Sequence, residues 1–228
     1  GGVTDGIVLR WVQNGTVDWV DIYTGDDGVL IYESSNITVT DCWISEVTTC
    51  VRVNGSTDCE VFSNSLGSGS ACIRLESSDG IDIHSNAVSA FSDGIVVTGR
   101  CSSRIHDNDV SSSTGRGIVL EDASGCSIDQ NSIDLWHVSG TGIVIDGSAN
   151  ATIANNTIGD YDGVYYDACN GVFVLDEGTQ FDAVRKGHRR GRFLQFDFHP
   201  PVITDGGVAF RLEEVMPRLI LIVDCVAD

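Results

Sequence analysis

The sequence is poor in lysine, methionine and proline, and it has no helical periodicity. Its 228 residues include one lysine, one methionine and three prolines. No window places apolar residues at a sustained spacing of about 3.6, the period of an amphipathic helix. The apolar run at 219–223 is far shorter than the roughly 20 residues that a membrane-spanning helix needs. These absences argue against a helical fold and against membrane insertion.

What the sequence does contain is a repeat of 22 residues. Three rows of positions share intervals of 22, 22, 22, 22, 23 and 25. The rows are Val20, Cys42, Asn64, Asn86, Asn108, Asn131, Asn156; Gly6, Gly28, Cys50, Cys72, Gly94, Gly117, Gly142; and Ile22, Ile44, Leu66, Val88, Val110, Ile133, Ile158. A fixed period of this length is typical of a solenoid, in which each repeat covers the core of the one before.

The interior of each repeat indicates which solenoid this is. Residues 94–110 read GIVVTGRCSSRIHDNDV, with two short β-branched runs separated by a polar turn. The pattern resembles the right-handed parallel β-helix family with PbH1-type repeats. The resemblance covers about residues 6–170 and implies an all-β, single-stranded parallel β-helix of about seven coils. It is specific for fold and not for activity, because that family includes lyases, hydrolases, phage tailspikes and inert surface proteins.

The asparagine row has a structural interpretation. Side chains one coil apart lie about 4.8 Å from each other, the strand spacing of a sheet. Stacked amides can therefore donate to and accept from one another and satisfy their buried polar groups. We interpret the row as a structural ladder, formed by Asn64, Asn86, Asn108, Asn131 and Asn156.

The period ends after residue 170, which predicts two domains, 1–170 and 171–228. The second part has short strand-like runs between turn signals, and we expect a small antiparallel β cap that also mediates assembly. It also carries a basic run, formed by Arg185, Lys186, His188, Arg189, Arg190 and Arg192. We do not expect nucleic-acid binding, because the rest of the chain would repel the same polyanion. An acidic neighbouring protomer, or the acidic coils of the same chain, is the expected contact.

The chain is strongly acidic, with a net charge of −20 and a pI near 4.3. Aspartate outnumbers glutamate by 25 to 8, and arginine outnumbers lysine by 12 to 1. Such a surface repels itself at low ionic strength, and molar salt removes that penalty. The composition favours a haloarchaeal or haloarchaeal-virus origin, with an ordinary acidic extracellular protein as the alternative.

The eight cysteines leave the compartment undecided. Cys50 and Cys72 lie one coil apart in one row, close enough for a disulfide, and two stacked thiols acting as small apolar residues are the alternative. No cysteine or histidine spacing suggests zinc, and no calcium-loop motif occurs. We therefore expect no metal site and no cofactor, beyond non-specific Na⁺, K⁺ or Ca²⁺ on the acidic surface.

One outward surface collects residues that could perform chemistry. The second strands of neighbouring coils place there Glu60, Asp82, His84, Arg104, His106 and Asp129. Paired carboxylates with histidines and an arginine are what a glycoside hydrolase or polysaccharide lyase needs. The motif set of pectin hydrolases is absent, and Phe62 is the one flanking aromatic residue. A solvated or glycan-contacting face is therefore the preferred interpretation, and catalysis is the alternative.

The first strands have a different outward row. It is apolar over most coils, and we predict that Leu30, Val96, Val119 and Val144 form an exposed oligomer face. Exposed apolar patches usually mark a contact with another chain. Together with the resemblance to viral tailspikes, the row predicts a homotrimer.

The tryptophans have two open interpretations. Trp11, Trp19, Trp43 and Trp136 fall at strand ends or in loops. Aromatic rings in such places can stack on sugar rings, and they can equally shield loop junctions.

Three functions remain. The first is a structural or host-attachment protein on the virion surface of a halophilic virus, as a trimeric spike, turret or tail-fibre module. It would contact other virion proteins and the surface glycan or S-layer of the host. The second is a polysaccharide-degrading enzyme. The third is a cellular surface-layer or NosD-like secreted β-helix of a halophilic archaeon.

Overall fold

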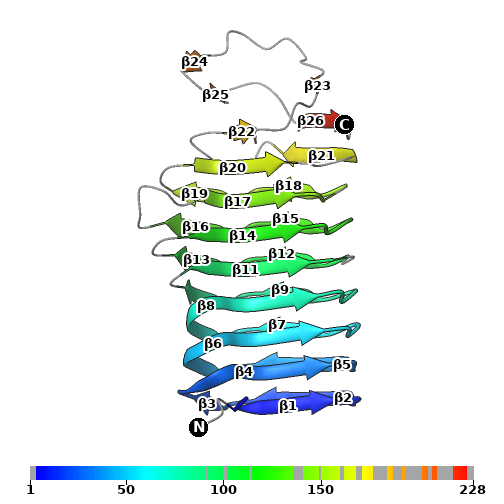
Figure 1. Ribbon diagram of the computed structural model, residues 1–228, viewed down its shortest axis with the longest axis vertical. Helices are drawn as coiled ribbons and strands as arrows, with labels where there is room; N and C mark the ends of the chain where they lie inside the picture. The colour runs from blue at the N-terminus through cyan, green and yellow to red at the C-terminus, as the bar shows by residue number, and fades with distance from the viewer. Residues whose placement is uncertain are drawn as a thin grey trace.

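The computed structural model of the chain is a stack of short strands that wind around one axis (Figure 1). It describes residues 4–90, 92–99, 102–112, 115–135, 141–148 and 150–159, and the strand backbones at 162–167, 171–176, 184–186, 192–193, 202–204, 207–209 and 218–224. Every regular element in these residues is a β-strand, so the prediction of an all-β parallel solenoid is confirmed. The same residues include no helix with the length and hydrophobicity to cross a membrane.

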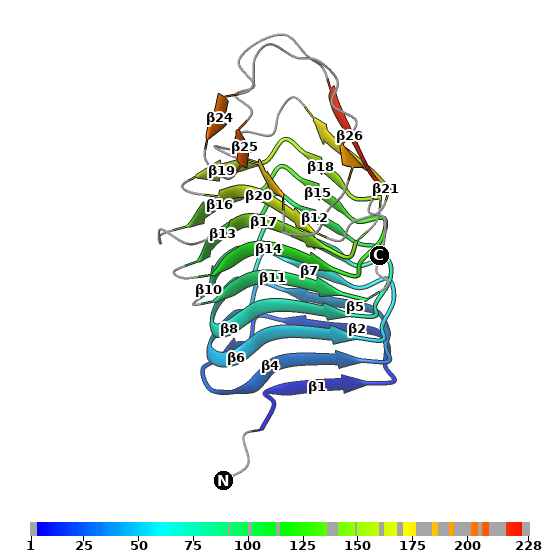
Figure 2. The ribbon, with the colours of Figure 1, turned by 45° about the horizontal axis from the view of Figure 1, so that its top comes forward.

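Two large sheets form the walls of the solenoid (Figures 1 and 2). The first contains β1 (Ile7–Arg10), β3 (Asp21–Ile22), β4 (Gly25–Tyr32), β6 (Trp43–Asn54), β8 (Ser65–Glu76), β10 (Ala87–Ala90), β11 (Asp93–Thr98), β13 (Asp109–Ser112), β14 (Arg116–Glu121), β16 (Ser132–Leu135), β17 (Thr141–Asp146), β19 (Thr157–Gly159), β20 (Asp162–Asp167) and β22 (Val184–Lys186). The second contains β2 (Gln13–Asp18), β5 (Ser35–Thr40), β7 (Glu60–Phe62), β9 (Asp82–His84), β12 (Arg104–His106), β15 (Ser127–Asp129), β18 (Thr152–Ala154), β21 (Gly171–Asp176), β26 (Arg218–Asp224) and β23 (Arg192–Phe193). We call them sheet A and sheet B.

The 22-residue period sets the register of the strands. Ile83 of β9 pairs with Ile105 of β12, which pairs with Ile128 of β15, and all three point inward and are buried. The longer intervals of 23 and 25 leave this register intact, because the added residues lie between β13 and β14 and between β16 and β17. Inward isoleucine, valine and leucine side chains from both sheets form one core along the axis.

The asparagines form a continuous column at the bend between sheet B and sheet A. The Nδ2 of each residue donates to the Oδ1 of the next, at 3.0 Å from Asn64 to Asn86 and 2.9 Å from Asn108 to Asn131. Each Nδ2 also donates to backbone carbonyls, as Asn108 does to Ile83 at 3.0 Å. Each Oδ1 also accepts a backbone N–H from the preceding coil, as that of Asn108 does from Asn86 at 3.1 Å. The buried amides therefore satisfy both themselves and the turn.

The residue directly before each position of the ladder row always turns the chain. These corner residues have positive φ, between 52° and 56°, and they are Trp19, Asp41, Ser63, Ser85, Asp107, Gln130 and Asn155. Left-handed backbone is uncommon for residues other than glycine. In every coil the chain adopts it at this position, where it bends from sheet B toward sheet A. The corner carries its side chain to the outer surface beside sheet B.

The glycine and cysteine row faces the core where neighbouring coils approach closely. A Cβ atom on Gly94 would lie 2.5 Å from the carbonyl oxygen of Gly117. Cys50 and Cys72 are fully buried in the same row. The disulfide between them stays a prediction; in the structure the Sγ of Cys50 donates to the Ile44 carbonyl and that of Cys72 to the Leu66 carbonyl, each at 3.5 Å.

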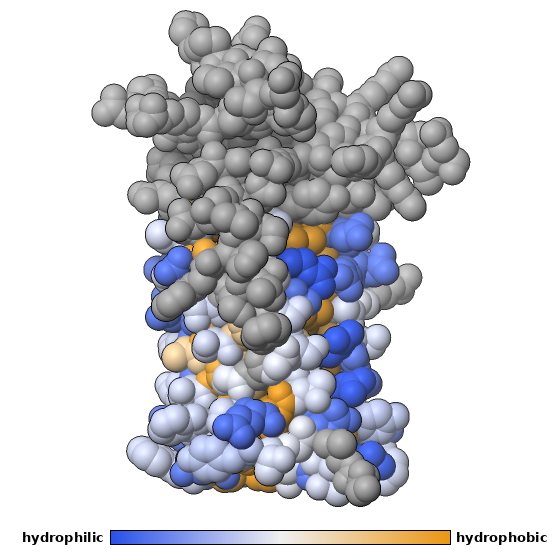
Figure 3. Space-filling model, turned by 60° about the vertical axis from the view of Figure 1, so that its left-hand side comes forward, coloured by the Kyte–Doolittle hydropathy of each residue, from blue (hydrophilic) through white to orange (hydrophobic). Residues whose placement is uncertain are grey.

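The predicted oligomer face is buried within the single chain, which corrects its expected exposure. The exposed fractions are 9% for Leu30, 3% for Val96, 0% for Val119 and 6% for Val144. The three valines form a second apolar cluster with Ala71, separate from the main core. The described surface in Figure 3 is mostly hydrophilic, with apolar residues in narrow strips. The alternation of strand residues showed that the row points outward, but it could not show that the chain covers it.

The C-terminal strands include antiparallel pairs, unlike the coils. β21 pairs parallel with β18 and antiparallel with β26, and β23 also pairs antiparallel with β26. β24 (Val202–Thr204) pairs antiparallel with β25 (Gly207–Ala209). The role of residues 171–228 as a cap and the boundary at residue 170 stay predictions. Of the basic run, the structure describes the backbone of residues 185, 186 and 192.

Candidate functional site

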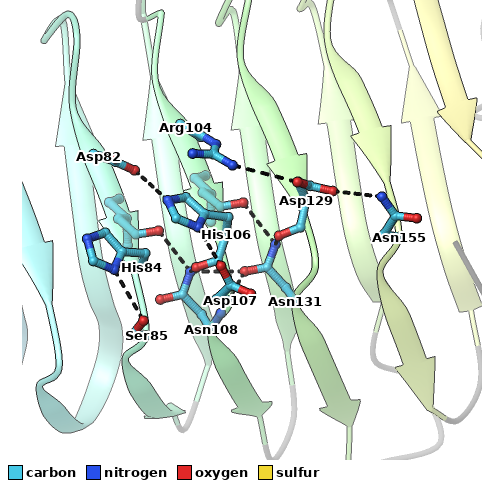
Figure 4. Close-up of polar contacts among 12 residues, drawn as sticks. Asp82, His84, Ser85, Arg104, His106, Asp107, Asn108, Asp129, Asn131 and Asn155 are labelled. Carbon is cyan, nitrogen blue, oxygen red and sulfur yellow. Dashed lines mark hydrogen bonds and ion pairs between the residues drawn. The ribbon is translucent and has the colours of Figure 1, made fainter. Parts of the chain in front are cut away.

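The six candidate residues of sheet B lie on one outer face, spread over the neighbouring strands β7, β9, β12 and β15. Figure 4 shows five of them, Asp82, His84, Arg104, His106 and Asp129. Glu60 pairs in register with Asp82, and Asp82 with Arg104. Two positions further along the same strands, His84 pairs with His106, which pairs with Asp129. The strand period therefore brings together residues that are up to 69 positions apart in the sequence. We call this group the sheet B column.

The two histidine rings of the column stack with a third ring, that of Phe62 on β7. Phe62 stacks on His84 with ring centroids 5.0 Å apart and planes 6° apart. His84 stacks on His106 at 4.9 Å and 17°. These distances match the strand spacing of the sheet, so the register itself produces the stack. Stacking along the axis leaves the edges of the rings, and not their faces, toward solvent.

Each histidine holds a carboxylate from the preceding coil. His84 Nε2 lies 3.0 Å from Glu60 Oε1, and His106 Nε2 lies 3.0 Å from Asp82 Oδ1. The contact is diagonal, because the partners are 24 residues apart and not 22. Both carboxylate side chains are about two-fifths exposed, whereas the imidazoles are mostly covered.

The corner residues hold the other nitrogen of each ring. His84 Nδ1 lies 3.2 Å from Ser85 Oγ, and His106 Nδ1 lies 2.7 Å from Asp107 Oδ2. The sequence prediction did not include Ser85 and Asp107. A signal for them exists, because each directly follows a column histidine at the position where the chain turns.

The upper end of the column is also paired. Arg104 Nη2 lies 3.8 Å from Asp129 Oδ2, and Asn155 Nδ2 donates to Asp129 Oδ1 at 3.1 Å. Asn155 is a third residue that the sequence prediction of the site did not include, and it too is a corner residue. Asp129 thus accepts a hydrogen bond on one oxygen and forms an ion pair through the other.

The arrangement provides carboxylate hydrogen-bond acceptors that neighbouring side chains hold in place. A retaining glycosidase needs one carboxylate positioned as nucleophile and a second as acid. Here Glu60, Asp82 and Asp129 are each held by a different imidazole, guanidinium or amide. In the part of the chain that the structure describes, no three His, Cys, Asp or Glu side chains are grouped to hold a metal ion.

A second polar cluster lies on the outer side of sheet A. Arg52 donates to Glu76 at 3.0 and 2.8 Å, and Arg74 donates to the other oxygen of Glu76 at 2.9 Å. Burial raises the pKa of Glu76, but the hydrogen bonds and charge of Arg52 outweigh burial and leave that pKa below its usual value. Burial also raises the pKa of Asp27, which lies 3.5 Å from Arg52. This cluster separates two like-charged arginines that the register places side by side.

A similar pairing occurs three coils further along sheet A. Arg116 donates to Asp93 from Nε at 3.0 Å and from Nη2 at 2.7 Å, and to Glu121 from Nη1 at 3.0 Å. The bonds to Asp93 raise the pKa of Arg116 further above its ordinary value. Such bidentate pairs fix side-chain geometry and leave little capacity for a ligand anion.

The buried thiols of Cys42 and Cys59 are poor nucleophiles. Burial raises the pKa of Cys42 and that of Cys59 above the ordinary thiol value. The Sγ of Cys42 donates to the Thr40 carbonyl at 3.1 Å, and that of Cys59 donates to the Thr57 carbonyl at 3.3 Å. Since the thiolate is the reactive form, both act as apolar residues of the core.

The described tryptophans all lie on the first two coils and are exposed. The exposed fractions are 71% for Trp11, 80% for Trp19 and 55% for Trp43. Trp11 Nε1 donates to Glu33 Oε2 at 2.6 Å, and this bond is the main cause of the lowered pKa of Glu33. Tyr23, which the sequence prediction missed, is 50% exposed and lies beside Trp43 with ring centroids 6.5 Å apart. Trp136 lies outside the described residues.

Comparison with known structures supports the fold. The chain is similar to the crystal structure of PfbA, a surface adhesin of Streptococcus pneumoniae, with a TM-score of 0.51 and 10% sequence identity. The match covers 90% of this chain and 70% of that one. At this identity the likeness shows the fold alone. No curated protein sequence matches the chain.

Comparison with protein families identifies a relationship that covers most of the sequence. Residues 2–179 match the family described as "Periplasmic copper-binding protein (NosD)". The match includes every coil described above and extends past β21. The chain therefore belongs to the NosD family.

Proposed function

We propose that the protein is a non-catalytic β-helix rod that works outside the cytoplasm and binds glycans. The observation that carries this proposal is the pairing of the sheet B column. Its carboxylates are each held in place by a neighbouring imidazole, guanidinium or amide, while about two-fifths of Glu60 and of Asp82 remains exposed. Carboxylates that are fixed and partly exposed can accept hydrogen bonds from sugar hydroxyls. The family description as periplasmic and the adhesin title of PfbA are in line with an exterior location.

The copper named in the family description does not fit the described residues. Copper takes imidazole and sulfur ligands whose lone pairs converge on one ion. The rings of His84 and His106 are stacked with planes 17° apart, so their nitrogen lone pairs run nearly parallel and do not meet. Each Nε2 also contacts a carboxylate at 3.0 Å. We therefore assign copper no role at these residues; weak, non-specific binding of Na⁺, K⁺ or Ca²⁺ stays a prediction.

Our more specific proposal is that the rod serves attachment in a halophilic setting. The support is the composition, with a net charge of −20 and a single lysine, which suits molar salt. Within this proposal, the protein is a spike, turret or tail-fibre module on a haloarchaeal virion. Display on the surface of a halophilic cell is the second candidate, and the NosD family match favours it.

The test of the proposed function separates binding from cleavage. The purified protein is incubated with surface polysaccharide in molar NaCl, and bound protein, reducing ends and unsaturated uronates are measured. We expect adsorption without new ends. We also expect the Glu60→Gln and Asp82→Asn variants to weaken adsorption severalfold, because each loses a charged acceptor. Asp134→Asn is the matched control, because the carboxylate of Asp134 is also exposed but lies on β16 of sheet A.

A catalytic function would give a different pattern. New reducing ends or unsaturated uronates that disappear in Glu60→Gln or Asp82→Asn would contradict the proposal and establish the enzyme alternative. Adsorption that neither variant changes would show that the column is not the contact.

A homotrimer stays a prediction, now without the support of the sheet A valine row. We expect light scattering in molar NaCl to give about three times the chain mass of 24.3 kDa. A monomer mass at micromolar concentration would contradict it.

A further inference from the structure

We infer that the first two coils carry an aromatic platform for a neutral polysaccharide, formed by Tyr23 and Trp43 with Trp19 at its edge. The inference rests on the proposed function and names a contact separate from the sheet B column. Its basis is the distribution of exposed apolar side chains. Among the residues that the structure describes, all the exposed large hydrophobic ones lie between positions 8 and 43.

The geometry places the rings together on one surface. Trp43 begins β6 and pairs in register with Asp21 of β3, and Tyr23 follows β3 on the same outward side. The two rings are 6.5 Å apart and tilted by 50°. The backbone N–H of Trp43 donates to the Val20 carbonyl at 3.0 Å, so the corner that carries Trp19 lies beside the start of β6.

The rings have no structural partner that would explain their exposure. Trp11 offers a contrast, because its indole N–H is bound to Glu33 at the opposite corner of the coil. Within the described part of the chain, the indole N–H groups of Trp19 and Trp43 have no hydrogen-bond partner and are open to solvent. Burying large aromatic rings gives much of the energy of recognition surfaces, and indole N–H groups add polar contacts there.

The strands above the platform leave room for a polymer. The residues that follow Trp43 in register along the axis are Ser65, Ala87, Asp109 and Ser132; all four are exposed, and their side chains are much smaller than an indole ring. An extended chain held on the rings could therefore continue along the axis without meeting a bulky side chain.

Charge selects the ligand class. The carboxylates nearest in sequence to the rings are Asp18, Asp21 and Asp41, and residues 18–24 and 40–46 contain no basic side chain. Sugar rings present apolar C–H faces to aromatic rings, and their hydroxyls donate to carboxylates. A uronate or sulfated polymer would be repelled. A quaternary ammonium needs rings that converge as a cage, which two half-exposed rings tilted by 50° do not form.

The experiment measures binding to neutral polysaccharides, with mannan, cellulose and dextran as probes and polygalacturonate as the anionic comparison. We expect the wild-type protein to bind one of the neutral polymers. Its affinity should be similar in about 0.1 M NaCl and in molar NaCl, because ring stacking depends little on salt. The double variant Tyr23→Ala/Trp43→Ala should bind at least about tenfold more weakly. Trp11→Ala removes a tryptophan that is more exposed than Trp43 and lies elsewhere, and it should leave the affinity unchanged. Trp43→Phe should retain most of it, and thermal melts establish that each variant is folded.

Each other outcome overturns the inference in a recognisable way. If the wild type binds a neutral polymer and the double variant binds it equally well, the platform is wrong and the proposed function stands. If polygalacturonate or a choline ligand is bound more tightly than every neutral polymer, the ligand class is wrong. If the folded wild type binds no polysaccharide at all, the proposed function and the inference both fail.

Discussion

Replacing Asn108 by alanine is expected to lower the free energy of unfolding by about 3–5 kcal/mol, because it leaves several buried polar groups without partners. Asn108 Oδ1 accepts from both the backbone N–H and the Nδ2 of Asn86. Its Nδ2 donates to the Ile83 and His106 carbonyls and to Asn131. The position is buried, so water does not replace these bonds.

Asn155→Ala is the matched control for this measurement. Asn155 is exposed, and the side-chain bond to Asp129 is the contact it would lose. We expect its loss to cost no more than about 1 kcal/mol. Urea denaturation of both variants at one fixed salt concentration gives the comparison. Equal midpoints for the two variants would show that the column of amides does not stabilise the turns.

Replacing Gly94 by alanine is expected to cost about 2–3 kcal/mol or more, because the added methyl group has no space. Its Cβ would lie 2.5 Å from the Gly117 carbonyl oxygen and 2.5 Å from Val110 Cγ1. The oxygen belongs to the backbone of the next coil, so relieving the clash requires two coils to separate. The measurement is the change in the urea midpoint relative to the wild type.

Gly67→Ala tests whether the effect of Gly94→Ala is specific to the site. Gly67 lies in β8, where a Cβ would meet its nearest atoms, Ser45 Cβ and the Ser89 carbonyl oxygen, at 3.8 Å. That is ordinary contact, so we expect a change within about 0.5 kcal/mol. A Gly94→Ala variant as stable as Gly67→Ala would mean that the coils are packed less closely than the structure has them.

The register of the coils was predictable from the sequence because it depends on spacing alone. A period of 22 places Asp82 beside Arg104 and His84 beside His106, and those residues are indeed strand partners. The same counting predicted that the outward rows of sheet B would gather carboxylates and histidines on one face. It needs no knowledge of side-chain conformation, since strand pairing fixes which positions lie side by side.

The pairing inside the sheet B column was not predictable in this way. Spacing places Glu60 beside Asp82, but the structure turns each carboxylate diagonally toward a histidine in the next coil. The direction depends on rotamers and on the corner residues Ser85 and Asp107, which hold the far side of the rings. This choice gives each carboxylate a histidine partner in the next coil.

The sequence by itself therefore determined the solenoid, the order of its coils and the outward or inward direction of each strand residue, because a regular period and strand alternation leave few alternatives. The tertiary structure alone decided which outward residues are exposed. Val119 and Trp43 both point away from the core, but the first is fully buried and the second is 55% exposed. Burial depends on what else the chain places over a strand, and no local pattern in the sequence records that.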